Sequence, residues 1–201
     1  RRGDGVNYYA LSMSLAAAIG PFIGMILQQI VPFNDIVIFS LAMIVICLVA
    51  VAVMHVQEFE LTEEHRKELQ AFHIQNFLEP KVAGISIVAF IVAVCYSSVL
   101  SFLASYAENL GLLTAGTLFF VVYALVITLA RPVAGVLFDR KGEDFVMYPT
   151  YACLAIGLFL LAMTTHSWMM LLAGVFVGLG YGTFMSNGQA ICIHLVKEFR
   201  I

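Results

Sequence analysis

Six apolar stretches, each long enough to cross a lipid bilayer, make up most of this chain of 201 residues. A helix needs about 20 apolar residues to span a hydrocarbon core of about 30 Å. In lipid, an α-helix satisfies its backbone polar groups within the segment itself. The pattern therefore predicts an all-α polytopic transmembrane bundle. Its expected spans run from about Tyr8 to Ile30, Asp35 to His55, Lys81 to Ala107, Leu113 to Val136, Phe145 to Thr165 and Trp168 to Leu195.

The composition supports this class. Apolar residues make up 62% of the chain and charged residues 11%, whereas a soluble domain is typically about 45–50% apolar and about 25% charged. A soluble protein of this length could not bury so much apolar surface. We therefore expect an integral, multi-pass membrane protein with the lipid bilayer as its main surroundings.

The basic residues fall on one side of these spans. The connections Val31–Asn34, Glu108–Leu112 and His166–Ser167 contain no Lys or Arg. All ten basic residues lie in or at the edge of the alternate connections: Arg1, Arg2, Arg66, Lys67, Lys81, Arg131, Arg140, Lys141, Lys197 and Arg200. Cytoplasmic loops of membrane proteins carry this excess of positive charge. The distribution predicts that both ends of the chain are cytoplasmic, in what we expect to be a bacterial plasma membrane.

The sequence offers no pattern typical of an enzyme. Cys47, Cys95, Cys153 and Cys192 each fall in a different apolar span, without a C-x-x-C or Cys/His spacing. Such thiols behave as small apolar groups, so we expect no disulfide and no metal site. No nucleophile–base pair or phosphate-binding loop is evident. We expect no catalytic residues, no cofactor and no nucleic-acid partner.

One long polar connection, Gln57–Glu79, separates the second span from the third. Thr62 can cap a short helix there, with Glu63 and Glu64 at its positive end. Glu79-Pro80 is typical of a helix start, because proline is favoured in the first turn.

A motif follows the fourth span. Gly135, Leu137, Asp139, Arg140 and Gly142 form the pattern Gly-x-Leu-x-Asp-Arg-x-Gly, which resembles the cytoplasmic loop of the major facilitator superfamily. Gly135 would let two helices approach closely, Asp139 can cap a helix and pair with an arginine, and Gly142 permits a tight reversal. The resemblance implies a conformational latch for one state of a transport cycle. The alternative is an ordinary Asp-Arg-Lys-Gly turn.

A second motif lies in the first span, at Ala16–Met25. It resembles the Gly-x-x-x-Gly-Pro-x-x-Gly-Gly signature that the antiporter branch of this superfamily carries in its fifth helix. Gly20 and Gly24 would allow close helix packing, and Pro21 would bend the helix. The chain departs from the signature at Ala16 and Met25, where the signature has glycine. The alternative is a kinked packing helix that implies no direction of transport.

The resemblance extends along the chain and implies a piece of a twelve-helix transporter, from the fifth helix to the tenth. Residues 1–56 would be the last two helices of the N-terminal half, and residues 57–80 the cytoplasmic loop between halves. Residues 81–201 would be the first four helices of the C-terminal half. We expect the remaining helices of a longer chain as partners, since two such halves rock around a site at the membrane midplane.

Polar groups deep in the spans are candidates for lining a substrate cavity, because their burial in lipid is costly. These candidates are Arg131, Tyr96, Ser97, Ser98, Tyr123, Ser186, Asn187 and Gln189. Arg131 can instead extend to the headgroups, and the uncharged groups can instead form hydrogen bonds between helices. No Asp or Glu lies in the middle of a span, so a coupling carboxylate is expected outside this chain.

These observations predict a secondary active transporter that exports drug-like small molecules in exchange for protons, by alternating access. Two alternatives remain open: proton-coupled uptake of a small solute, and a membrane receptor with the same fold that does not transport.

Overall fold

The computed structural model describes residues 2–54 and 80–195. Within these ranges every regular element is helical. In chain order the helices are α1 (Arg2–Ile30), α2 (Phe33–Val53), α5 (Pro80–Asn109), α6 (Leu113–Lys141), α7 (Glu143–Ala162), α8 (Ser167–Val177), the π-helical turn η1 (Gly178–Gly182) and α9 (Thr183–Leu195). The prediction of an all-α bundle is confirmed.

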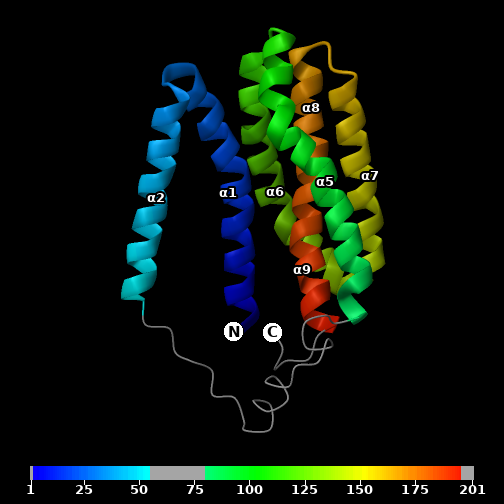
Figure 1. The fold of residues 1–201 in the computed structure, drawn as a ribbon. Helices are drawn as coiled ribbons and strands as arrows, with labels where there is room; N and C mark the ends of the chain where they lie inside the picture. The colour runs from blue at the N-terminus through cyan, green and yellow to red at the C-terminus, as the bar shows by residue number, and fades with distance from the viewer. Residues whose placement is uncertain (1, 55–79, 196–201) are drawn as a thin grey trace.

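The helices run up and down between two ends of the bundle (Figure 1). Short connections join α1 to α2, α5 to α6 and α7 to α8 at one end. At the other end Gly142 alone separates α6 from α7. Five stretches of the described chain are long and apolar enough to span a membrane: α2, most of α5, α6, α7, and α8 to α9 as one continuous segment. In α1 the apolar part is Leu15–Ile30.

The observed helices differ from the predicted spans at their ends. α6 continues to Lys141, five residues beyond the Val136 expected from hydropathy. The predicted latch loop is therefore mostly the last turns of a helix, and that part of the prediction is wrong. Arg140 and Lys141 lie in the final turn, where cations interact favourably with the helix dipole. α5 begins at Pro80, as predicted, whereas the features expected within 57–79 lie outside the described residues.

The core is built around α6. Phe119, Tyr123 and Ile127, spaced at helical intervals along it, are at most 1% exposed. They pack against α8, η1 and α5, and α7 packs along α8 on the outer side. Two glycines allow these contacts to be close. A Cβ on Gly157 would lie 2.7 Å from Val177 Cγ2, and one on Gly174 would lie 3.1 Å from the Phe119 carbonyl oxygen.

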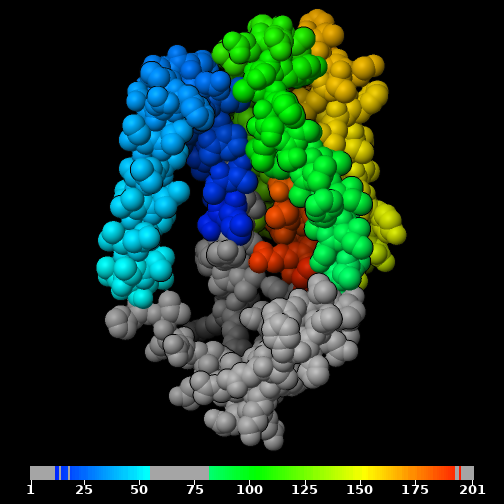
Figure 2. All heavy atoms as spheres, viewed as in Figure 1, coloured from blue at the N-terminus to red at the C-terminus, as the bar shows by residue number. Residues whose placement is uncertain are grey.

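Of the first two helices, α1 belongs to this core and α2 stands apart from it. α1 packs along α6, and its Met25 is part of the buried cluster. α2 has no buried residue and diverges from α1 away from the connection that joins them (Figure 2). Its Val, Ile, Leu and Phe side chains are exposed along its whole length. In a bilayer such a surface faces lipid or further helices.

Candidate functional site

Three tyrosine rings from three different helices form a stack in the interior. The Tyr96 ring on α5 lies 3.7 Å from the Tyr181 ring of η1, with an interplanar angle of 14°. Tyr96 also stacks on Tyr123 of α6, with ring centroids 5.8 Å apart. Tyr96 and Tyr123 are 2% and 0% exposed, whereas Tyr181 is partly exposed. We call Tyr96, Tyr123 and Tyr181 the tyrosine layer.

The hydroxyl groups of this layer have an unusual environment. The hydroxyls of Tyr96 and Tyr123 are buried, and neither has a hydrogen-bond partner of ordinary geometry among the described residues. The two phenols interact electrostatically with each other. Two facing hydroxyls can satisfy only one O–H between them. At least one buried O–H therefore has no acceptor within this pair. Such a donor destabilises the protein unless another group accepts its hydrogen bond.

The π-helical turn places Tyr181 in this layer. Gly178, Gly180 and Gly182 flank it and are all buried. A Cβ on Gly180 would lie 2.6 Å from the Leu154 backbone nitrogen, and one on Gly182 would overlap Ile127. These glycines bring η1 into contact with α7 on one side and with α6 on the other. π-Helical turns inside α-helices are frequent at functional sites.

Two further polar residues lie nearer the Gly142 end of the bundle. Arg131 is eight residues after Tyr123 on α6, about 12 Å along the helix axis. Its Nε atom is buried, and its charge interacts with the Tyr123 phenol. Asn187 of α9 is 6% exposed, with a buried Nδ2 atom that has no partner among the described residues. It lies six residues after Tyr181, about 9 Å along the axis. We call Arg131 and Asn187 the basic layer, after the charge of Arg131.

The other polar candidates are placed differently. Ser97 and Ser98 are exposed, and their hydroxyls donate to the carbonyl oxygens of Val94 and Cys95 in their own helix. The Ser186 hydroxyl donates to the Gly182 carbonyl oxygen, and Gln189 is partly exposed. The structure thus brings Tyr96 and Tyr123 together and does not bring the serines to them. Tyr181 was not among the sequence candidates, although a tyrosine between two glycines marks a place where helices can close tightly around a ring.

The latch motif forms the end of α6 and the turn to α7. Gly142 has a φ of 87°, in the left-handed region that favours glycine, as its predicted role in a reversal requires. Asp139 and Arg140 are exposed. No side chain caps α7, so Asp139 does not cap that helix. Lys141 Nζ lies 4.3 Å from the centroid of the Phe145 ring across the turn.

The glycines of the two sequence motifs make no close approach in the described chain. A Cβ built on Gly20, Gly24 or Gly135 would meet no atom within 4 Å. The helix α1 continues through Pro21. Any close packing at these three glycines therefore involves surfaces other than those of the described residues.

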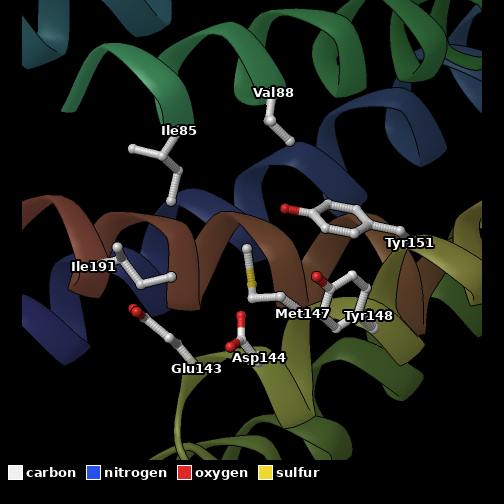
Figure 3. A pocket seen from close by; sticks show the side chains of 8 residues that line it. All are labelled: Ile85, Val88, Glu143, Asp144, Met147, Tyr148, Tyr151 and Ile191. Atoms are coloured by element: carbon white, nitrogen blue, oxygen red, sulfur yellow. The ribbon is translucent and has the colours of Figure 1, made fainter. Parts of the chain in front are cut away.

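A pocket of about 270 Å³ lies between α5, α7 and α9 (Figure 3). Ile85, Val88 and Ile191 form apolar walls, and Glu143 and Asp144 supply carboxylates from the first turn of α7. This pocket was not predicted from the sequence. Two acidic residues in a first helical turn are usually explained by the helix dipole. Nothing in the sequence around Glu143 and Asp144 indicates that apolar residues of α5 and α9 lie opposite them.

The described residues contain no group of three or more His, Cys, Asp or Glu side chains that could hold a metal ion. The four cysteines are free thiols.

Comparison with known proteins decides the family. The sequence profile of the Major Facilitator Superfamily matches residues 1–200. The chain belongs to this superfamily. The superfamily is one of membrane transporters, which are not enzymes. No solved structure gives a significant match.

Curated relatives of this superfamily member include the "Multidrug resistance protein MdtG" of Salmonella typhi, Salmonella arizonae and Salmonella paratyphi B. Each is 29% identical to it over 109 residues. The match covers 51% of this chain and 26% of the relative, so it extends over about a quarter of the relatives' length.

Proposed function

We propose that this protein is a secondary active transporter that exports drug-like small molecules in exchange for protons, by alternating access. The observation that carries the proposal is the similarity of half of the chain to proteins named for multidrug resistance. The partial antiporter signature around Gly20, Pro21 and Gly24 supports the direction of transport. The apolar and aromatic character of the interior suits drug-like compounds, because such surfaces adapt to varied ligands.

The arrangement of helices supports a division into two halves. We propose that α1 and α2 end the N-terminal half and that α5 to α9 begin the C-terminal half. α1 packs against α6, whereas α2 contacts only α1 to any extent. In this division the contact of α1 with α6 would join two halves that rock against each other.

The charge distribution supports an orientation with the Gly142 end in the cytoplasm. Arg140 and Lys141 lie at that end, and the helices that begin with Arg2 and Pro80 start there (Figure 1). The described connections at the opposite end carry no basic residue. In this orientation Asp139, Arg140 and Gly142 face the cytoplasm as the latch, and Asp139 would pair with groups beyond the described residues.

The test uses cells that express the intact protein. They are loaded with a panel of fluorescent drugs, and efflux is followed with and without a protonophore and in the variant Asp139→Asn. We expect efflux that the protonophore abolishes and that Asp139→Asn slows by about tenfold, the effect of losing one charge-assisted contact. Asp35→Asn is the matched control, because Asp35 is an exposed residue in the first turn of α2 at the opposite end.

Unchanged retention across the whole panel would overturn drug export. Protonophore-sensitive accumulation in place of efflux would support the uptake alternative, and ligand binding without either flux would support a receptor.

A further inference from the structure

The tyrosine layer and the basic layer together have the chemistry of a ligand site. We propose that they bind a planar aromatic compound that carries an anionic or hydrogen-bond-accepting group, and that the protein discriminates against aromatic cations. This inference rests on the proposed function and names the class of its substrate.

The rings account for the aromatic part. Tyr96 stacks on both Tyr123 and Tyr181, and of the three rings only Tyr181 is partly exposed. An aromatic ligand can stack on the open side of Tyr181, or take its place against Tyr96 if Tyr181 rotates. Offset stacking of rings contributes beyond the burial of apolar area. Tyr181 lies in a π-helical turn. The wider turn points its side chain in another direction than a regular α-helix would at the same place in the sequence.

The unsatisfied polar atoms account for the accepting group. The buried Asn187 Nδ2 atom is a donor, and the Tyr96 and Tyr123 hydroxyls retain at least one free O–H between them. Each buried donor without a partner destabilises the protein. A ligand that brings acceptor oxygens removes this cost, whereas a ligand that brings only donors does not.

The charges account for the anionic preference. Arg131 places a positive charge within α6, away from the terminal turns of that helix. The planar guanidinium suits a carboxylate. The roughly 9 to 12 Å between the two layers along the helix axes matches a compound with a fused ring system and an acid at one end.

The carboxylates Glu143 and Asp144 in the pocket at the Gly142 end offer the opposite selectivity (Figure 3). If they determined binding, aromatic cations would bind better. A pair of dyes with the same ring and opposite charge therefore discriminates between the two sites.

The test measures binding of fluorescein, an anion, and rhodamine 123, a cation with the same xanthene ring, to the intact protein in lipid nanodiscs by fluorescence anisotropy. We expect fluorescein to bind at least about tenfold more tightly, which is the order of one charge-assisted contact. Arg131→Gln should remove the preference, and Arg131→Lys should keep part of it. Equal affinities, or tighter binding of rhodamine 123, would overturn the inference.

Two matched phenol variants separate a binding role from a structural one. Tyr123→Phe keeps the ring but removes a buried hydroxyl without a partner, so it should raise the Tm while it weakens fluorescein binding about fivefold. Tyr106→Phe is the control on α5, because its hydroxyl donates to the Leu161 carbonyl oxygen at 2.9 Å. It should lower the Tm and leave binding unchanged. If Tyr123→Phe leaves the affinity unchanged, the inference fails.

Efflux of the same dyes from cells separates this inference from the proposed function. Efflux of rhodamine 123 without specific binding of fluorescein would leave drug export standing and refute the anionic site. Specific binding of fluorescein without efflux of any dye would support the site and refute export.

Discussion

The contact of η1 with α7 gives a stability prediction that can be worked out from the structure. In Gly180→Ala the new Cβ would lie 2.6 Å from the Leu154 nitrogen and 2.7 Å from its Cα. Carbon contacts are optimal at about 3.5–4.0 Å, so one helix must move by roughly 1 Å. Because the opposing atoms are backbone, no side chain can rotate away. Overpacking costs about 1–3 kcal/mol.

Two terms of opposite sign decide the net effect. Alanine is favoured over glycine in a helix by about 1 kcal/mol, which leaves a net loss of about 2 kcal/mol at the upper end of the overpacking range. For about 200 residues this corresponds to a decrease in Tm of about 4–8 °C, and a longer intact protein would shift by less. The assay is thermal unfolding of the intact protein in detergent, followed by the helical circular dichroism signal.

Gly84→Ala is the matched control, because Gly84 also lies within a helix, α5, and a Cβ there would meet no atom within 4 Å. It should leave the Tm unchanged or raise it by a few degrees, since only the propensity difference of about 1 kcal/mol acts. If both alanine variants shift the Tm in the same direction and by the same amount, the reasoning from close contact is wrong.

Two further substitutions test local features of the fold. Tyr106→Phe leaves the Leu161 carbonyl oxygen without its donor and should cost about 1 kcal/mol, measured by the same unfolding assay; an unchanged Tm would contradict the hydrogen bond between α5 and α7. Gly142→Ala forces a Cβ into a backbone with a φ of 87° and should cost about 1–2 kcal/mol. If Gly142→Ala is as stable as wild type, the reversal between α6 and α7 does not depend on the left-handed conformation.

Hydropathy predicted the helical class, and in the described residues five of the six expected spans are long and apolar enough to cross a membrane. The reason is that the length of an apolar span follows from the thickness of the bilayer. The last turns of α6 were predicted as loop because Asp139, Arg140 and Lys141 are polar. Hydropathy reports where a chain leaves the lipid, whereas intrahelical hydrogen bonds continue until a residue such as Gly142 breaks them.

The candidate site was predicted only in part, for a similar physical reason. Buried polar residues stand out in an apolar span, so Tyr96, Tyr123 and Asn187 could be found. Tyr181 could not be assigned, because its place depends on the π-helical turn. A single extra residue in one turn changes which face of the helix a side chain occupies, and glycines at 178, 180 and 182 do not reveal that turn in the sequence.

The helix α6 has a closely packed side and a side that meets α5 through aromatic rings, and both sides belong to the candidate site. On one side of α6, Gly174 and Gly178 lie close to the carbonyl oxygens of Phe119 and Tyr123, and Gly182 lies against the Ile127 side chain. This side is held by close contacts. On the other side, Tyr96 of α5 meets Tyr123 only through aromatic rings. Rings can separate and stack again on a ligand, whereas close contacts of this kind cannot loosen without repacking.

Tyr123 and Arg131 would therefore keep their positions while α5 moves. A ligand that takes the place of Tyr181 against Tyr96 would meet donors held in place beforehand, which reduces the entropy lost on binding. In the proposed site the glycines of α8 and η1 would thus contribute to binding without touching the ligand, because they fix the helix that carries its partners.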